Sequence, residues 1–234
     1  MAIFVFLALS ACSDQGTNSG RVDAAQYDAY WLWAGVKPQP VLDRAKAIYI
    51  LGAEINSSNL SGVQILRPSP PSIKQVDIWL VIRLETLDLS EKQYQALFDL
   101  VGRWNSAGGE LAGVQIDFDA NTRGLDGYAA FLKGFRKRLS AGYKLSITGL
   151  LDWSANGDPS QLNGLADTID EAVLQTYQGR QTIAGYDKWL RNLEELPMPF
   201  RIGLVQNGEW REPEKLQQNR NFKGYVVFLL NPEQ

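Results

Sequence analysis

The chain has 234 residues, a net charge of −3, no histidine and a single cysteine. These counts exclude imidazole-dependent catalytic triads and metal sites, cysteine-cluster metal sites, and a disulfide within the chain. The acidic balance gives no basis for nucleic-acid binding. Hydrophobic residues make up 45% of the chain, which is ordinary for a globular fold. We expect no cofactor and no metal, so any chemistry must use carboxylates, hydroxyls, amides, tyrosine, lysine or arginine.

An apolar run at residues 2–9 has the length of the hydrophobic part of a signal peptide. It is too short to span a bilayer. The run ends in Leu9-Ser10-Ala11-Cys12, which resembles the lipobox of bacterial lipoproteins, where the cysteine is acylated. This resemblance implies a lipid on Cys12 and a place in the bacterial cell envelope, either lipid-anchored or periplasmic or extracellular. Membrane contact would then be made through the anchor alone.

We therefore expect residues 1–12 to be a signal segment and residues 13–26 to be a flexible tether. The first part of that tether is rich in Ser, Asn, Gly and Gln, as flexible linkers are. Residues up to about Val22 should then lie outside the folded core. The alternative is an apolar N-terminus with an incidental buried cysteine.

Eight short apolar or β-rich segments follow, and each has the length of a strand. They are Tyr27–Trp33, Ala47–Leu51, Val76–Arg83, Gly113–Phe118, Lys144–Leu150, Ala172–Thr176, Phe200–Leu204 and Tyr225–Leu229. Strands that alternate with helices pair in parallel through right-handed crossovers. Eight of them allow the sheet to close, which removes its free edges. We predict that residues 27–234 form a single (β/α)8 TIM-type barrel with short loops; an open, doubly wound sheet is the alternative.

Helical periodicity supports the connections between several of these strands. The periodic segments are residues 90–104, 128–139 and 186–193. Ser90 and Gln93 have the spacing of a capping box, which predicts a helix that begins directly after Ser90. The second crossover should be irregular, because residues 56–72 show no helical pattern and Val63–Leu66 looks like an extra strand.

The fourth predicted strand ends in two carboxylates. Side chains alternate along a strand, so its apolar residues should face the helices, and Gln115, Asp117 and Asp119 should face the lumen. Functional residues of such barrels lie at the C-terminal ends of strands. A carboxylate buried there needs partners or a raised pKa. We hypothesise that Asp117 and Asp119 are catalytic; alternatively, Asp117 is a structural hydrogen-bond hub and Asp119 caps the following turn.

Other strands end in polar side chains that are predicted to share this mouth. They are Arg83 and Glu85 on the third strand, Asp152 on the fifth, and Gln175 and Tyr177 on the sixth. Each also has an ordinary structural role as its alternative, such as an ion pair, a turn or a packed aromatic ring. We predict that Arg83, Glu85, Asp152 and Tyr177 converge with Asp117 and Asp119 at one barrel mouth. Together with Gln175 and Gln115, the first four would bind the substrate.

The segment from Gly113 to Asp119 resembles the fourth-strand signature of family 18 glycoside hydrolases, the chitinase-type barrels, which reads Asp-Gly-x-Asp-x-Asp-x-Glu. Asp117 matches the third aspartate and Asp119 stands at the catalytic glutamate, whereas Ala112 and Gln115 replace the first two aspartates. Similarly, Leu174-Gln175-Thr176-Tyr177-Gln178 resembles that family's Met-x-Tyr-Asp segment, with Tyr177 at the tyrosine and Gln178 in place of the aspartate.

This resemblance implies a specific mechanism. Asp119 would protonate the leaving glycosidic oxygen, and Asp117 would hold Asp119 and raise its pKa. The substrate's acetamido group, oriented by Tyr177, would be the nucleophile. If the enzyme instead uses two carboxylates, Glu85 or Asp152 would be the partner of Asp119.

Over most of its length the chain resembles an uncharacterised family of bacterial proteins known by a domain-of-unknown-function label. The likeness is carried by Tyr30-Trp31-Leu32-Trp33, Ile82-Arg83-Leu84-Glu85 and Leu150-Leu151-Asp152-Trp153. It implies a barrel with possible sugar chemistry and supplies no established activity. Three functions remain open: a glycosidase acting on a cell-wall or extracellular glycan, a non-catalytic carbohydrate-binding barrel, and a scaffold lipoprotein without a sugar ligand.

Overall fold

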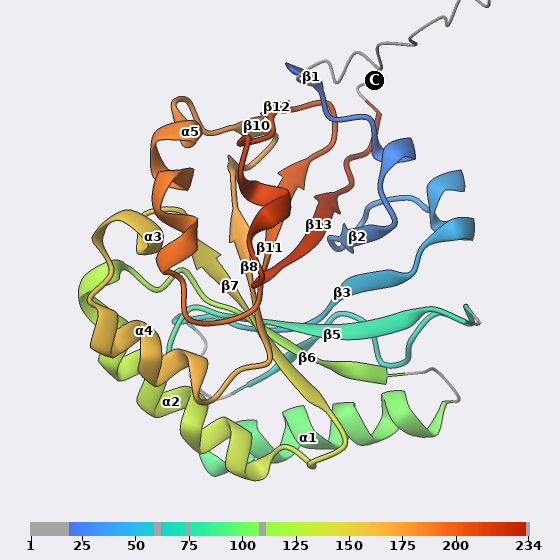
Figure 1. Cartoon of the computed structure of the whole chain (residues 1–234). Coiled ribbons are helices and arrows are strands. Elements are labelled where there is room, and N and C mark those ends of the chain that lie inside the picture. Colours follow the sequence, from blue (N-terminus) through green and yellow to red (C-terminus); the bar gives the residue numbers. More distant parts are fainter. Residues whose placement is uncertain (1–18, 59–61, 74, 108–110, 233–234) are drawn as a thin grey trace, which may run out of the picture.

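The computed structural model describes residues 19–58, 62–73, 75–107 and 111–232. Eight parallel strands pair in the order β2-β3-β5-β6-β7-β8-β11-β13, and β13 pairs again with β2 (Figure 1). Their bounds are β2 Ala29–Leu32, β3 Ala47–Ile55, β5 Asp77–Leu84, β6 Leu111–Asp117, β7 Lys144–Leu150, β8 Glu171–Gln175, β11 Phe200–Val205 and β13 Phe222–Phe228. The chain is therefore a closed eight-stranded parallel barrel, as predicted, and the open-sheet alternative is wrong.

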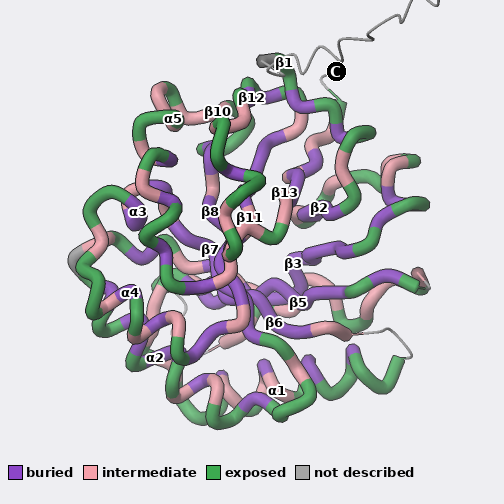
Figure 2. Tube along the Cα trace, viewed as in Figure 1, coloured by how far each residue is buried: buried purple, intermediate pink, exposed green. Residues whose placement is uncertain are grey.

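Alternation along the strands separates two hydrophobic clusters. Side chains that point outward, such as Ile48, Ile116 and Leu174, belong to a large cluster between the barrel and its helices. Those that point inward, such as Tyr49 and Trp79, form a smaller cluster that fills the lumen. Figure 2 shows the resulting pattern, with buried strands inside and helices that are exposed on their outer sides. The barrel interior is thus a packed core that supports the mouth above it.

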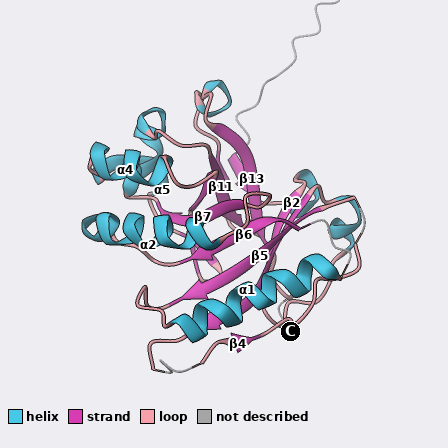
Figure 3. Ribbon diagram, turned by 90° about the horizontal axis from the view of Figure 1, so that it is seen from below, coloured by secondary structure: helices cyan, strands magenta, loops and turns pink. Residues whose placement is uncertain are grey.

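Helices cover the outside of the central strands. The longer ones are α1 Glu91–Ser106, α2 Leu125–Arg138 and α4 Pro159–Ala166, which lie outside the sheet in Figure 3. The predicted capping box of α1 is confirmed, because the Ser90 hydroxyl accepts from the Gln93 amide and the Gln93 side chain accepts from the Ser90 amide. The short helix α3 is Trp153–Asn156.

Two connections depart from a simple strand–helix unit. The described part of the second crossover contains β4 Gln64–Ile65, which pairs antiparallel with β3, so its predicted irregularity is confirmed. The predicted helix at residues 186–193 is divided into α5 Tyr186–Trp189 and a 3₁₀ helix at Leu190–Glu195, which contains non-helical backbone at Asn192.

Two small ribbons stand outside the barrel sheet. β1 Ser19–Arg21 pairs antiparallel with β12 Glu209–Arg211, and β9 Tyr177–Gln178 pairs with β10 Gln181–Thr182 in a hairpin. The ribbons approach each other closely at Gly208, where an added Cβ would lie 2.5 Å from the Thr182 hydroxyl oxygen. Glycine at that position therefore lets the two ribbons lie side by side.

The β1–β12 pairing corrects the expected start of the folded core. Ser19–Arg21 belong to a strand, and Val22 is only 2% exposed. The expectation that residues up to Val22 lie outside the core is therefore wrong for residues 19–22, and the described part of the expected tether belongs to the domain. The predicted signal segment and Cys12 lie outside the described residues. Within the described ranges, no helix combines the length and apolarity needed to cross a bilayer.

Candidate functional site

The C-terminal ends of the barrel strands surround a cavity of about 890 Å³. This volume lies within the range of small-molecule and cofactor pockets in proteins, roughly 300–1,000 Å³. Six of the residues predicted from the sequence line it: Arg83, Asp117, Asp119, Asp152, Gln175 and Tyr177. They come from strands β5, β6, β7 and β8 or from the residues that follow them, so their convergence follows from closure of the barrel. Gln115 and Glu85 do not line the cavity.

Asp117 is the buried carboxylate of the site. Asp117 is the last residue of β6 and is only 6% exposed. Its carboxylate accepts a hydrogen bond of 2.9 Å from the Thr148 hydroxyl. Burial raises the pKa of Asp117 to about 6, against the lowering effects of Thr148 and Arg83, while Asp119 and Glu54 add smaller upward contributions. A carboxyl with this pKa can be protonated or ionised near neutral pH, which suits proton transfer.

Asp119 lies two residues further on, beyond the end of β6, and it is exposed to the cavity. Asp117 is therefore the deeper of the two carboxylates. The Phe118 side chain between them points to the opposite face and contacts the Tyr128 ring of α2, with ring centroids 5.3 Å apart. This alternation places both carboxylates on the lumen side, as predicted.

A third carboxylate, Asp152, lines the cavity from the segment after β7. One of its oxygens accepts a hydrogen bond from the Thr122 hydroxyl. Its other oxygen, Oδ1, is buried and has no hydrogen-bond partner among the described residues. Trp31 also lines the cavity and is only 5% exposed. Its indole N–H likewise has no hydrogen-bond partner among the described residues. The residues that line the cavity thus include one acceptor atom and one donor atom that are shielded from solvent and have no partner in the described part of the chain.

Arg83 places a positive charge beside Asp117. The pairing register aligns Glu54 of β3, Arg83 of β5 and Asp117 of β6 on neighbouring strands. The guanidinium carbon of Arg83 also lies 4.9 Å from the centre of the Trp33 ring, a cation–π arrangement. Glu54 was not predicted from the sequence, because the bulge in β3 near Gly52 changes which residues face the lumen.

An aromatic wall completes the cavity. It consists of Trp31, Trp33, Tyr177, Trp189 and Phe228. Phe228 stacks on Tyr177 at 5.3 Å and meets Trp31 edge-on at 5.4 Å, so the rings support one another in fixed orientations. Flat apolar faces next to carboxylates match the alternating C–H and hydroxyl surfaces of sugars. Except for Tyr177, these rings were not predicted as site residues, because aromatic side chains on strands and on the apolar faces of helices usually belong to the core.

Two predicted binding residues occupy other places. Gln115 is 1% exposed and lies below the cavity, where its side-chain amide donates to the Ser146 hydroxyl at 3.0 Å. Glu85 follows the last residue of β5, and its carboxylate accepts hydrogen bonds from the Ser57 amide and hydroxyl, which lower its pKa. The prediction that Glu85 converges with the others is therefore wrong, and Gln115 does not reach the cavity in which it was expected to bind the substrate. Gln115 is too deep, and the strand ends before Glu85 can share the inward face of Arg83.

A buried polar network lies beneath the cavity. The carboxylate of Glu171 accepts from the Tyr49 hydroxyl at 2.5 Å, from the Arg201 guanidinium at 3.0 Å and from the Ser146 hydroxyl at 3.3 Å. Ser146 in turn accepts from Gln115. These contacts compensate the charge of Glu171 inside the lumen, so the network supports the layer that contains Asp117.

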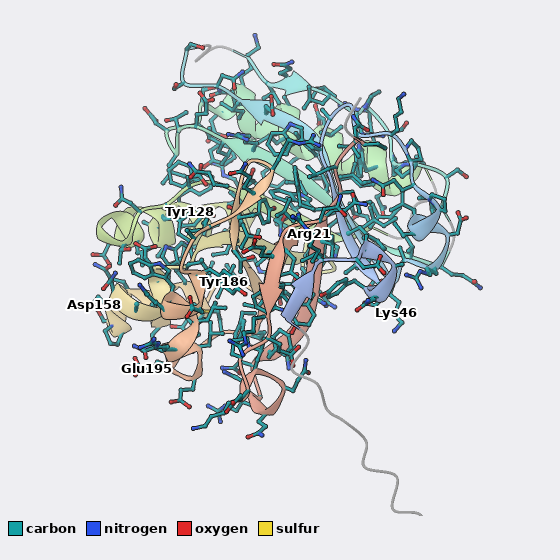
Figure 4. The ribbon with its side chains drawn as sticks, turned by 90° about the horizontal axis from the view of Figure 1, so that it is seen from above. Arg21, Lys46, Tyr128, Asp158, Tyr186 and Glu195 are labelled. Carbon is teal, nitrogen blue, oxygen red and sulfur yellow. The ribbon has the colours of Figure 1, made fainter. Side chains whose placement is uncertain are left out.

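Tyr128 brings a further polar atom near the acid pair. Its phenol is fully buried, and burial first, then the charges of Asp117 and Asp119, raise its pKa well above the ordinary value. The hydroxyl has no hydrogen-bond partner within the described part of the chain. Figure 4 labels Tyr128 among the side chains of the domain.

No three acidic or cysteine side chains of the described ranges are grouped so as to hold a metal ion.

Solved structures with a similar fold include both enzymes and inhibitors. The chitinase domain of the spore coat protein CotE from Clostridium difficile is 17% identical, with a TM-score of 0.50 over 86% of this chain and 68% of that one. A chitinase from Rhizomucor miehei is 14% identical, with a TM-score of 0.51 over 76% and 68%. The xylanase and alpha-amylase inhibitor protein XAIP-II from Scadoxus multiflorus is 14% identical, with a TM-score of 0.52 over 85% and 91%. These similarities show the fold alone.

No curated protein sequence matches the chain. A family model described as "Domain of unknown function (DUF3142)" matches residues 74–204, from the end of the second crossover to β11. This match includes the strands that supply Arg83, Asp117, Asp152 and Tyr177 to the cavity. The chain therefore belongs to the DUF3142 family.

Proposed function

We propose that this protein binds a glycan containing acetamido sugars at the barrel mouth and hydrolyses it. The observation that carries the proposal is the cavity itself, which combines a carboxylate pair at the end of β6 with an aromatic wall. A scaffold protein has no need of such a cavity, and a mouth filled by side chains would have favoured that function instead. Aromatic faces bind the apolar surfaces of sugar rings, and the carboxylates accept from sugar hydroxyls.

In the proposed reaction, Asp119 donates a proton to the glycosidic oxygen as the bond from that oxygen to the anomeric carbon breaks. The acetamido oxygen of the same sugar attacks the anomeric carbon and forms a cyclic intermediate. Water then opens this intermediate and returns a proton to Asp119. Asp117, buried below with a pKa of about 6, shares protons with Asp119, and Tyr177 and Asp152 orient the acetamido group.

The second candidate is a barrel that binds the same glycans without cleaving them. Asp119 favours this alternative, because its side chain is one methylene shorter than the glutamate of family 18 hydrolases. A displacement of about 1 Å from the productive position can lower a rate roughly a hundredfold.

Activity against acetamido-sugar polymers decides between the two. The purified chain is incubated with chitin oligosaccharides and with peptidoglycan glycan strands, and release of reducing ends is measured together with tryptophan fluorescence. For a hydrolase, we expect Asp119→Asn to lower turnover by roughly 10²–10⁴ while the melting temperature stays close to that of the wild type. Asp117→Asn should lower turnover and shift the acid limb of the pH profile.

Each outcome has a clear meaning. Fluorescence changes without products would favour the binding barrel. Turnover that survives Asp119→Asn would remove Asp119 from the mechanism. If neither binding nor products are detected for either polymer, the proposed function is wrong.

We further propose that the protein is held in the bacterial cell envelope by a lipid on Cys12. Support for this comes from the sequence, where the apolar run of residues 2–9 ends at the single cysteine of the chain. Such a position would bring the barrel to the glycans of the cell wall.

A further inference from the structure

A second, smaller cavity of about 290 Å³ adjoins the main one. The β9–β10 hairpin separates the two, and Arg180 and Ile183 line both. The first strand of the hairpin, with Tyr177, faces the main cavity, and the second, with Gln181, faces the smaller one. The opposite wall of the smaller cavity is the β1–β12 ribbon, which contributes Arg21 and Glu209. The two cavities therefore lie on either side of the hairpin and share two of its lining residues.

The walls of the smaller cavity suit a hydroxyl-rich ligand. Tyr186 supplies an aromatic face, while Arg21, Gln181 and Glu209 supply a cation, an amide and a carboxylate. Figure 4 labels two of these residues, Arg21 and Tyr186. An aromatic ring beside side chains that both donate and accept is the same combination that lines the main cavity. A ligand confined to the main cavity would not contact these groups.

Two of these groups, the Tyr186 ring and the Arg21 guanidinium, are held in place before any ligand binds. The Tyr186 ring stacks on Trp210 with centroids 5.3 Å apart, and its hydroxyl accepts from the Arg211 amide at 2.5 Å. The Arg21 guanidinium donates to the Asn207 carbonyl at 3.0 Å. Asn207 lies in the turn between β11 and β12 and has a positive φ of 64°. Groups that are already ordered lose little conformational entropy on binding.

We propose that the ligand is a linear glycan of several sugar units whose chain passes from the main cavity across the β9–β10 hairpin into the smaller cavity. This inference rests on the proposed function and adds the length of the substrate. The protein would bind an oligosaccharide or polysaccharide, and a disaccharide would contact only part of the binding surface.

The test is a titration of the full chain with chitin oligosaccharides, from the dimer to the hexamer, by calorimetry. Affinity should rise with length beyond the units that the main cavity accommodates. Gln181→Ala should weaken hexamer binding about threefold to tenfold, the size of one or two lost hydrogen bonds, and leave dimer binding unchanged. Gln181 is exposed, so this variant keeps the fold; Arg21→Ala is a second variant with the same expectation. Lys144→Ala, at the exposed N-terminal end of β7, is the control and should change neither affinity.

The possible failures are separable. If the dimer binds and the hexamer binds no more tightly, or if Gln181→Ala and Arg21→Ala weaken both ligands equally, the extended surface is not used and the inference is wrong. If neither the chitin oligosaccharides nor peptidoglycan glycan strands bind, the proposed function fails; if only the peptidoglycan strands bind, the same comparison is made with their short and long fragments.

Discussion

Replacing Asp117 with asparagine should stabilise the protein, and the gain should depend on pH. Burial raises the pKa of Asp117 from 3.8 to about 6 in the folded state. Between these two values the folded chain retains a proton that the unfolded chain has released, so the wild-type free energy of unfolding falls as pH rises. The stability contributed by the protonated carboxyl is complete below about pH 3.8 and is lost as pH passes 6. Asparagine has the same size and never ionises, so the variant does not incur this loss.

The size of the effect follows from the two pKa values. Each unit of difference corresponds to about 1.4 kcal/mol, so the raised pKa of Asp117 lowers the wild-type free energy of unfolding by about 3 kcal/mol at pH 7.5 and by about 1 kcal/mol at pH 4.5, relative to its value below pH 3.8. Any cost of the asparagine amide itself, such as an altered contact with Thr148, is the same at both pH values and cancels in the comparison. The advantage of Asp117→Asn over the wild type should therefore grow by about 2 kcal/mol between the two conditions.

Denaturant titrations of both proteins at about pH 4.5 and about pH 7.5 measure this difference. Asp119→Asn is the matched control, because it removes the neighbouring carboxylate at an exposed position. If the stability difference between Asp117→Asn and the wild type is the same at both pH values, the buried carboxyl does not have the raised pKa, and its role as a proton donor to Asp119 loses its physical basis.

Three further predictions concern the rest of the chain. Arg201→Met should destabilise the protein by about 3 kcal/mol, because the buried carboxylate of Glu171 loses its cationic partner; thermal and chemical unfolding measure the loss, and a change below 1 kcal/mol would show that Tyr49 and Ser146 suffice. Ser90→Ala should cost about 1 kcal/mol through loss of the capping box of α1, and unchanged unfolding would contradict that role. Mass spectrometry of protein extracted from membranes should find a mature chain that begins with acylated Cys12; a soluble chain that still begins at Met1 would exclude the anchor.

The barrel could be predicted because each of its strands is visible in a short stretch of the sequence. Each strand is an apolar run of suitable length, and parallel pairing with closure follows from the alternation of strands with helices. The ribbons β1–β12 and β9–β10 could not be predicted in the same way. Their strands have two or three residues, such as Ser19–Arg21, and are mostly polar. They exist because the barrel brings distant segments together, and no periodicity within the segments indicates that.

The sequence predicted which face of each strand the site residues share, but not how far along the barrel axis each of them lies. Alternation along β6 gives the shared face of Gln115, Asp117 and Asp119 correctly. Their different roles depend on how far each lies along the barrel axis: Gln115 is in the packed lumen, Asp117 at the floor of the cavity and Asp119 in its open part. Strand ends and bulges decide that depth, and they also explain why Glu85 turns away to Ser57.

The β1–β12 ribbon also determines the direction in which the barrel faces if Cys12 carries a lipid. Ser19 is fixed against Arg211, beside the smaller cavity at the mouth. Seven peptide units separate Cys12 from Ser19, and a fully extended chain spans at most about 3.5 Å per residue, or roughly 25 Å in total. In an anchored protein, the cavity at the C-terminal ends of the strands would then lie close to the membrane surface. The glycan strands it could reach would be those nearest to that membrane, and enlarging residues 13–18 by insertion would be the direct way to extend its reach.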